Sequence, residues 1–127
     1  MRLKSEIFAS ALVRNVFARG DFAAIERKGA SDGGAIFIRQ SFRDGTETLY
    51  APAPQSFFED DDSSRRLFER RVHSSAREDV TAALEREVRF DPDLWIVALE
   101  ADDIGDLIDL AETDEKKIDP NDSVFRR

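Results

Sequence analysis

The sequence holds few residues with the chemistry of a catalyst, and His73 is the first of them to consider. It is the only histidine of the chain, and Ser74 and Ser75 follow it directly. A histidine can activate a serine hydroxyl as a nucleophile when the fold brings the two together. The two serines are better explained as helix-capping residues, and His73 as a histidine at the end of a strand. A small enzyme is therefore the least supported of three functional hypotheses, and we expect a non-catalytic protein.

Metal and cofactor chemistry is also poorly supported. The chain has no cysteine, and one histidine cannot form a multi-histidine centre. The acidic run Glu59 to Asp62 and the segment Asp102 to Asp106 both lack the Asp-x-Asp-x-Asp-Gly spacing of a calcium loop. The glycine-rich stretch 29–34 matches neither the dinucleotide-binding fingerprint nor the P-loop. We expect no metal and no cofactor.

The strongest basic cluster consists of four arginines, Arg65, Arg66, Arg70 and Arg71. On a strand, Arg66 and Arg70 would share one face while the other two shared the opposite face, which divides the charge across the sheet. We expect them to neutralise the neighbouring acids rather than to contact nucleic acid. Weak nucleic-acid binding through residues 65–71 is the alternative hypothesis. Tyr50 could then stack on a base, although a single aromatic on a strand is typical of a core.

Two features indicate a protein partner or a homodimer. Pro52 and Pro54 follow Tyr50 in a segment that can hold an extended, polyproline-like conformation. The second feature is an apolar stripe among acids, at a spacing that predicts an amphipathic helix suited to a partner's groove; its residues are Ile104, Leu107 and Ile108. The prolines could also only protect a sheet edge, and the helix could pack on its own domain or on a second subunit.

The elements that would position these residues follow from hydrophobic periodicity. Helical spacing predicts a helix over Ser5 to Arg19, with Gly20 as its stop. Alternation and turn residues predict three strands that form an antiparallel meander, over 22–27, 35–39 and 46–50, with a tight turn at Asp44–Gly45. Residues 66–73 alternate as a fourth strand would, although helical spacing also fits them.

The second half of the chain continues this pattern. A Ser-x-x-Glu capping box at Ser75 predicts a second helix, which Asp91-Pro92 ends. The apolar run 94–99 is typical of a central strand covered on both faces. These elements predict an α+β fold with one mixed sheet, as a single domain over 1–101. Residues 102–127 form an acidic C-terminal extension, a short helix and then a frayed tail. The expected core contains Leu12, Val16, Phe37, Ile38, Leu84, Trp95, Ile96 and Val97.

Several stretches resemble a bacterial family, domain-of-unknown-function family 1491. The resemblance rests on residues 1–7, 34–37, 49–55 and 90–95, which include Gly34-Ala35-Ile36-Phe37 and Phe90-Asp91-Pro92-Asp93-Leu94-Trp95, and it covers about residues 1–100. Members of the family usually end soon after the last strand, so the acidic extension is a departure. The resemblance implies no activity, substrate or catalytic residue.

The charge of the chain is consistent with an interaction protein. The formal net charge of −8 arises after residue 50, because residues 1–50 carry 8 basic and 6 acidic side chains. A negative field of this kind repels nucleic acid and anionic membranes. No apolar run approaches the length of a membrane span or a signal peptide, so we expect a cytoplasmic protein. The favoured hypothesis is a non-catalytic accessory or protein-interaction domain.

Overall fold

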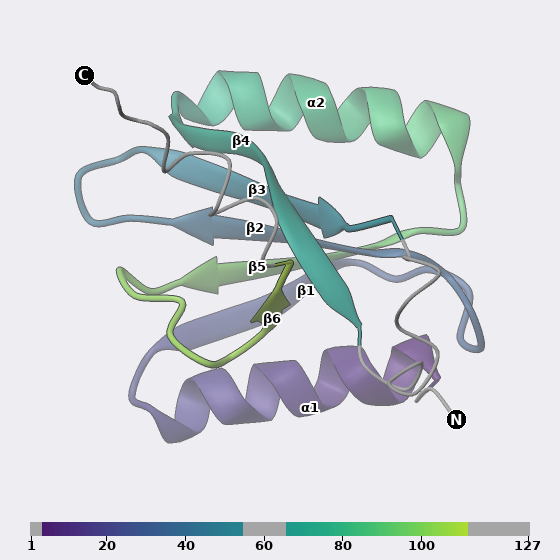
Figure 1. Ribbon diagram of the computed structural model, residues 1–127, viewed down its shortest axis with the longest axis horizontal. Coiled ribbons are helices and arrows are strands. Elements are labelled where there is room, and N and C mark those ends of the chain that lie inside the picture. The colour runs from purple at the N-terminus through teal and green to yellow at the C-terminus, as the bar shows by residue number, and fades with distance from the viewer. Residues whose placement is uncertain (1–3, 55–65, 112–127) are drawn as a thin grey trace, which may run out of the picture.

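A mixed β-sheet carries one helix on each of its faces (Figure 1). This computed structural model describes residues 4–54 and 66–111. The elements in chain order are α1 (Ser5–Ala18), β1 (Phe22–Arg27), β2 (Ile36–Ser41), β3 (Glu47–Pro52), β4 (Leu67–Ser75), α2 (Arg77–Phe90), β5 (Trp95–Glu100) and β6 (Asp109–Leu110). The α+β fold with an N-terminal helix and one mixed sheet is confirmed, and residues 67–75 adopt the strand conformation.

The strand order is β1-β5-β2-β3-β4-β6, which differs in one respect from the expected meander. The antiparallel neighbours are β2, β3 and β4, whereas β1 is separated from β2 by β5. β5 pairs antiparallel with β1 and parallel with β2, so it lies between two strands as its apolar sequence predicted. The prediction that β1 pairs with β2 was wrong, because a short connection does not force two consecutive strands to be neighbours.

The helix α1 packs under β1 and β5 and fills one of two apolar layers. Its buried stripe of Ala9, Leu12 and Val16 contacts inward-facing residues of the sheet such as Ile38. Lys4 is the N-cap of this helix, and the Ser5 hydroxyl donates to the Gly34 carbonyl at 2.5 Å. The helix ends before Gly20, whose φ of 91° is accessible to glycine.

The helix α2 packs on the opposite face, over β3 and β4, and forms the second apolar layer. Val80, Ala83 and Leu84 are its buried residues. The predicted capping box is absent, because Ala76 is the N-cap and Ser75 instead donates to the Asp79 carboxylate. All eight residues expected in the core are at most 5% exposed; they are Leu12, Val16, Phe37, Ile38, Leu84, Trp95, Ile96 and Val97.

The amphipathic helix predicted over 104–111 does not form, and this prediction was wrong. The segment contains turns and then β6, which pairs parallel with β4. Gly105 has a φ of 52°, and the Asp103 carboxylate accepts its backbone N–H at 2.9 Å, a local turn that competes with a helix. Ile104, Leu107 and Ile108 pack on the α1-side core, so their apolar side chains cover the protein's own sheet. The frayed tail predicted for the end of the chain lies outside the described residues.

Candidate functional site: a groove over β1 and β5

The α2 face of the sheet is only partly covered by a helix. Because α2 lies over β3 and β4, it covers only the part of β5 around Ile96, and no helix of the described residues lies over β1 on this face. A helix is about 10 Å across, whereas neighbouring strands are about 4.8 Å apart, so one helix covers roughly two strands. A cavity of about 480 Å³ lies between α2 and β1 on this face of the sheet. Its apolar lining consists of Leu84, Val88 and Ile96.

A β-bulge places two consecutive charged residues in this cavity. Ile25 pairs with Val97 and Arg27 with Ile96, so Glu26 is an extra residue on β1. In a regular strand, Glu26 and Arg27 would point to opposite faces. The bulge instead lets both line the cavity, which is the usual effect of such an insertion on side-chain direction.

Arg39 forms a buried polar network on the wall of the cavity. Its side chain is 9% exposed, and its Nε donates to Glu47 Oε1 at 2.7 Å. Its Nη1 donates to Glu26 Oε2 at 3.1 Å, and Nη2 donates to the Thr81 hydroxyl. The second Glu47 oxygen accepts from the Ser41 hydroxyl at 2.9 Å. The network therefore ties β1, β2, β3 and α2 together, and each charge in it has an opposite partner.

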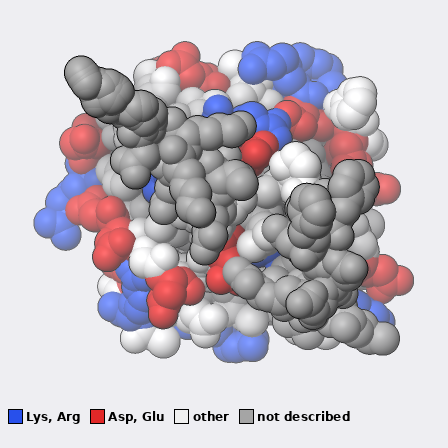
Figure 2. Space-filling view, viewed as in Figure 1, with Lys and Arg blue, Asp and Glu red and all other residues white. Residues whose placement is uncertain are grey.

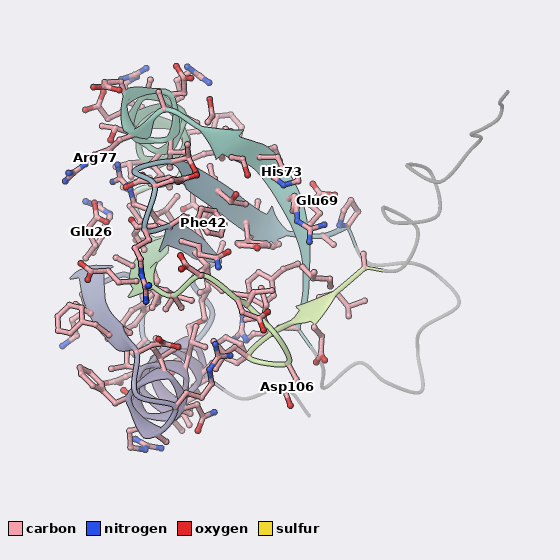
Figure 3. All side chains as sticks on the ribbon, turned by 90° about the vertical axis from the view of Figure 1, so that its left-hand side faces the viewer. Glu26, Phe42, Glu69, His73, Arg77 and Asp106 are labelled. Carbon is pink, nitrogen blue, oxygen red and sulfur yellow. The ribbon has the colours of Figure 1, made fainter. Side chains whose placement is uncertain are left out.

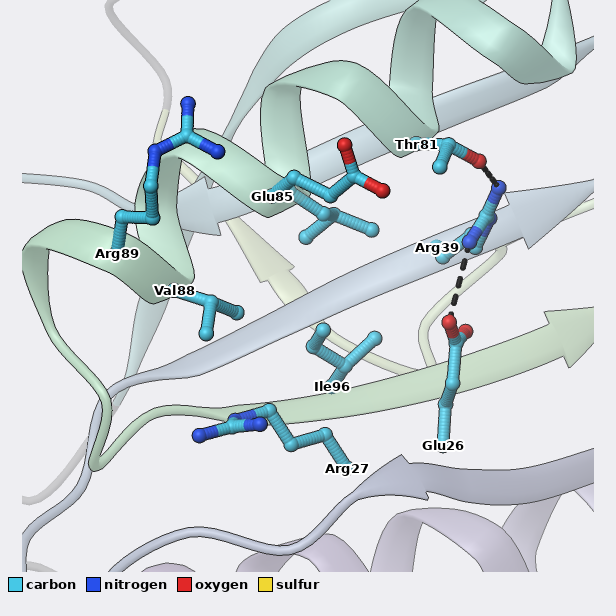
Figure 4. Close-up of a pocket in the computed structure, with 9 residues that line it drawn as sticks. Glu26, Arg27, Arg39, Thr81, Glu85, Val88, Arg89 and Ile96 are labelled. Atoms are coloured by element: carbon cyan, nitrogen blue, oxygen red, sulfur yellow. Dashed lines mark hydrogen bonds and ion pairs between the residues drawn. The ribbon is translucent and has the colours of Figure 1, made fainter.

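Two other arginines flank one end of the cavity, Arg27 from β1 and Arg89 from the last turn of α2 (Figure 4). Arg27 Nη2 donates to the Pro92 carbonyl at 2.8 Å, while its Nε is buried and has no hydrogen-bond partner. Among the described residues, neither arginine forms an ion pair. Glu85 lies on α2 one turn before Arg89 and also lines the cavity.

Two further hollows extend the cavity into a groove. One of about 210 Å³ shares Glu26 and Arg39 with it and includes Ala98. The next, of about 410 Å³, is lined by charged side chains of both signs, among them Asp102 and Arg43, which form an ion pair at 3.7 Å. Figure 3 shows Glu26 and Arg77 on one side of the molecule, away from Glu69 and His73 on β4. We call these three hollows the α2–β1 groove.

The structure does not bring the predicted arginine cluster onto one surface. Arg66 lies over the Phe8 ring at 5.3 Å, and its Nη2 donates to the Ser5 hydroxyl at 3.2 Å. Arg71 forms ion pairs with Glu69 and Glu87, each at 3.2 Å, on the α2 side. Arg65 and the acidic run 59–62 lie outside the described residues. In Figure 2, acidic and basic side chains alternate around the visible part of the face.

Tyr50 and the two prolines also lie apart from the groove. Tyr50 is 2% exposed, and its hydroxyl donates to Gln40 Oε1 at 2.8 Å, so its ring is part of the α1-side core and cannot stack on a base. Burial raises the pKa of Tyr50, and the nearby Arg70 opposes this increase. Pro52 ends β3 opposite Phe68, and Pro54 is exposed.

A serine-nucleophile motif in the sequence was missed, but the structure does not place it in a catalytic arrangement. Gly29-Ala30-Ser31-Asp32-Gly33 has the Gly-x-Ser-x-Gly spacing of a nucleophile elbow. It connects β1 to β2 rather than a strand to a helix, and His73 lies on β4, beyond β3 in the sheet. No group of three acidic or histidine side chains in residues 4–54 and 66–111 could hold a metal ion.

The comparison with known families identifies the chain's relatives. A family model named DUF1491, described as a protein of unknown function, matches residues 3–109. The chain belongs to the DUF1491 family. The match reaches the first residue of β6, so residues 102–109, which were expected to depart from the family, are part of the family pattern.

Solved structures of relatives share this fold. A solution structure of a protein from A. tumefaciens is 57% identical, with a TM-score of 0.78 over 87% of this chain and 96% of that one. A crystal structure of a DUF1491 family protein from Caulobacter crescentus is 30% identical, with a TM-score of 0.72 over 88% of this chain and all of that one. No curated protein matches. Among the described residues, no helix is long and apolar enough to cross a membrane.

Sequence reasoning missed the groove residues, although one signal was present. Arg39 and Glu47 flank the turn at Asp44–Gly45, and the hairpin register pairs Ser41 with Glu47. Opposite charges two positions apart across a hairpin lie within reach of each other. Arg27 and Arg89 had no such signal, because they come from elements far apart in the chain.

Proposed function

We propose that this DUF1491 domain is a non-catalytic protein-interaction module that holds an amphipathic segment of a partner protein in the α2–β1 groove. The observation that supports it is the part of the sheet face that no helix of the described residues covers. The middle hollow includes Phe22, which is 50% exposed, and an exposed apolar side chain among charged groups is typical of a docking site for another chain. The buried Arg39–Glu47 pair fixes the groove wall from three strands and α2, which favours a preformed surface.

The occupant that fits best has an apolar face and charged flanks. The groove has Leu84, Val88 and Ile96 at one end and both acidic and basic side chains at the other, so it is apolar in its depth and charged at its rim. An amphipathic helix or an extended segment presents apolar side chains on one side and polar ones on the other, which matches this pattern.

The test uses a charged substitution in the groove. Ala98 is half-buried on β5 and lines the middle hollow, so Ala98→Lys places a cation on the docking surface. The matched control is Ala82→Lys, at an exposed position of α2 outside the groove. Affinity purification from native lysate with quantitative mass spectrometry should yield a partner that wild type and Ala82→Lys retain and that Ala98→Lys loses at least about tenfold.

Both variants must unfold at the wild-type temperature to within a few degrees for the comparison to hold. A photo-crosslinker at Glu85, which lines the groove, should join to that partner, whereas one at the exposed Glu78 should not. Equal retention by the two lysine variants would reject the groove as the docking surface.

A further inference from the structure

The Arg27–Arg89 end of the groove has an unbalanced positive charge. Arg39 is neutralised by Glu47 and Glu26, with separations of 2.7 and 3.1 Å. Arg27 and Arg89 have no ion pair among the described residues, and Glu85 is the remaining carboxylate that lines this cavity. The charged side chains that line this cavity are three arginines and two glutamates, which gives a net charge of +1.

Arg27 also has an unused hydrogen-bond donor. Its Nη2 is occupied by the Pro92 carbonyl, which fixes the guanidinium against the β5 end of the groove. Its Nε is buried and has no acceptor. A buried N–H without an acceptor costs free energy.

The surface between the two arginines is apolar. Leu84, Val88 and Ile96 line the same cavity, and Figure 4 shows Val88 on α2 and Ile96 on β5 between the side chains of Arg89 and Arg27. A ligand that fits must therefore carry a negative acceptor and an adjoining apolar group. Guanidinium groups are well suited to carboxylates, because their N–H donors match two oxygens in a plane.

We propose that this end of the groove binds a carboxylate carried by an apolar residue or beside one, on the partner segment. The inference rests on the proposed function, because the cavity is one end of the partner groove.

The test compares small probes that differ in one group. N-acetyl-leucine carries the carboxylate and the apolar side chain, N-acetyl-leucinamide lacks the charge, and N-acetylglycine lacks the side chain. Each is titrated into the full chain while methyl NMR shifts of Leu84, Val88 and Ile96 are followed. N-acetyl-leucine should produce saturable shifts with an affinity about tenfold above those of the other two probes.

Variants then locate the carboxylate. Arg89→Gln and Arg27→Gln should each reduce the affinity for N-acetyl-leucine to that for the amide. Arg86→Gln, at an exposed position of α2 that does not line the cavity, should leave it unchanged. Adding N-acetyl-glutamyl-leucinamide separates the two sources of the carboxylate: tighter binding of this probe indicates a side-chain carboxylate, and tighter binding of N-acetyl-leucine indicates a chain terminus.

Equal affinity for the acid and the amide, or an unchanged affinity in Arg89→Gln, would overturn the inference. This result is distinguishable from failure of the proposed function. If the probes fail while the Ala98-sensitive partner is still captured, the interaction module stands without the carboxylate site. If the probes bind and no partner is captured, the site stands and the proposed function falls.

Discussion

Arg39 is a charged residue inside a sheet, and its burial depends on its partners. The guanidinium donates to two carboxylates, a threonine hydroxyl and a backbone carbonyl. A buried charge without such partners would pay a large desolvation cost. Because Glu47 is itself 5% exposed, each residue of this pair makes the burial of the other possible.

Removal of the Glu47 carboxylate from this pair should therefore lower the free energy of unfolding. Glu47→Leu leaves the Arg39 Nε without its acceptor, so the free energy of unfolding should fall by about 3 kcal/mol. Glu85→Gln, which alters an exposed groove carboxylate, should change it by less than about 0.5 kcal/mol. The double variant Arg39→Met, Glu47→Leu should recover most of the loss, because apolar residues of similar volume can replace a buried ion pair. Urea unfolding followed by circular dichroism measures all three, and an equal loss in the single and double variants would contradict this account.

Tyr50 predicts a pH dependence at the alkaline end. Burial raises its pKa above the ordinary value of 10.0 in the folded state, and Arg70 partly offsets this. Above about pH 10 the unfolded chain loses the phenolic proton while the folded chain keeps it, so stability falls as pH rises toward the folded pKa. Below that range the contribution is fully present.

The comparison with Tyr50→Phe isolates this effect. The variant lacks the hydroxyl bonded to Gln40, which should cost about 1 kcal/mol at neutral pH. Its disadvantage should shrink between about pH 9 and pH 11, because only the wild type has Tyr50 to ionise. Urea midpoints of both proteins across this range provide the measurement. A constant difference would show that the Tyr50 pKa is not raised.

At the scale of elements, the position of β5 between β1 and β2 constrains the path of the connection between those two strands. Residues 28–35 must cross the start of β5, where Ala30 N donates to the Asp93 carbonyl and Trp95 Nε1 donates to the Ala30 carbonyl. The crossing is so close that a side chain at Gly29 would meet the Leu94 carbonyl at 2.6 Å. Gly29 is therefore required by backbone approach rather than by its dihedral angles.

A pair of glycine substitutions tests this crossing. Gly29→Ala should reduce the free energy of unfolding by about 2–3 kcal/mol, because the obstacle is backbone that cannot move freely. Gly33→Ala, in the same connection with nothing within 4 Å, should be neutral or stabilising by up to about 1 kcal/mol. Thermal and urea unfolding measure both variants. Similar effects at the two glycines would mean that the connection does not pass so close to β5.

At the scale of the whole molecule, the two faces of the sheet are covered differently. On the α1 side, Ile104, Leu107 and Ile108 pack on the core beside the helix. On the α2 side, no described segment does the same for β1 and β5, and the α2–β1 groove results. The groove therefore exists because α2 covers only part of this face of the sheet, and the residues that line it come from β1, β2, β5 and α2.

This architecture predicts a gradient of amide hydrogen exchange. β5 is bonded on both sides, to β1 and β2, so its buried amides at Ile96 and Val97 should exchange only through global unfolding. β6 has two residues and one neighbour, so its amides should exchange orders of magnitude faster. Native-state exchange followed by NMR checks this. Slow exchange confined to the β2–β3–β4 meander would contradict the central place of β5.

The sequence by itself determined the local elements and the core. Stripes such as Leu12 and Val16 on α1 and the apolar run of β5 specify helix or strand within a few residues of chain, because burial selects the matching period. The sequence did not determine the conformation of residues 104–111, because the same apolar spacing fits an amphipathic helix or a turn whose apolar side chains pack on the sheet. That choice depends on an open sheet face that a local pattern does not show.

Only the tertiary structure decided the strand order and the site. The place of β5 between β1 and β2 results from pairing between distant segments, which leaves no mark in the local periodicity. That pairing fixes β1 at the sheet edge, and the bulge at Glu26 turns Arg27 toward α2. Arg27, Arg39 and Arg89 are unremarkable in the sequence, and they share a groove because packing leaves half of one sheet face open.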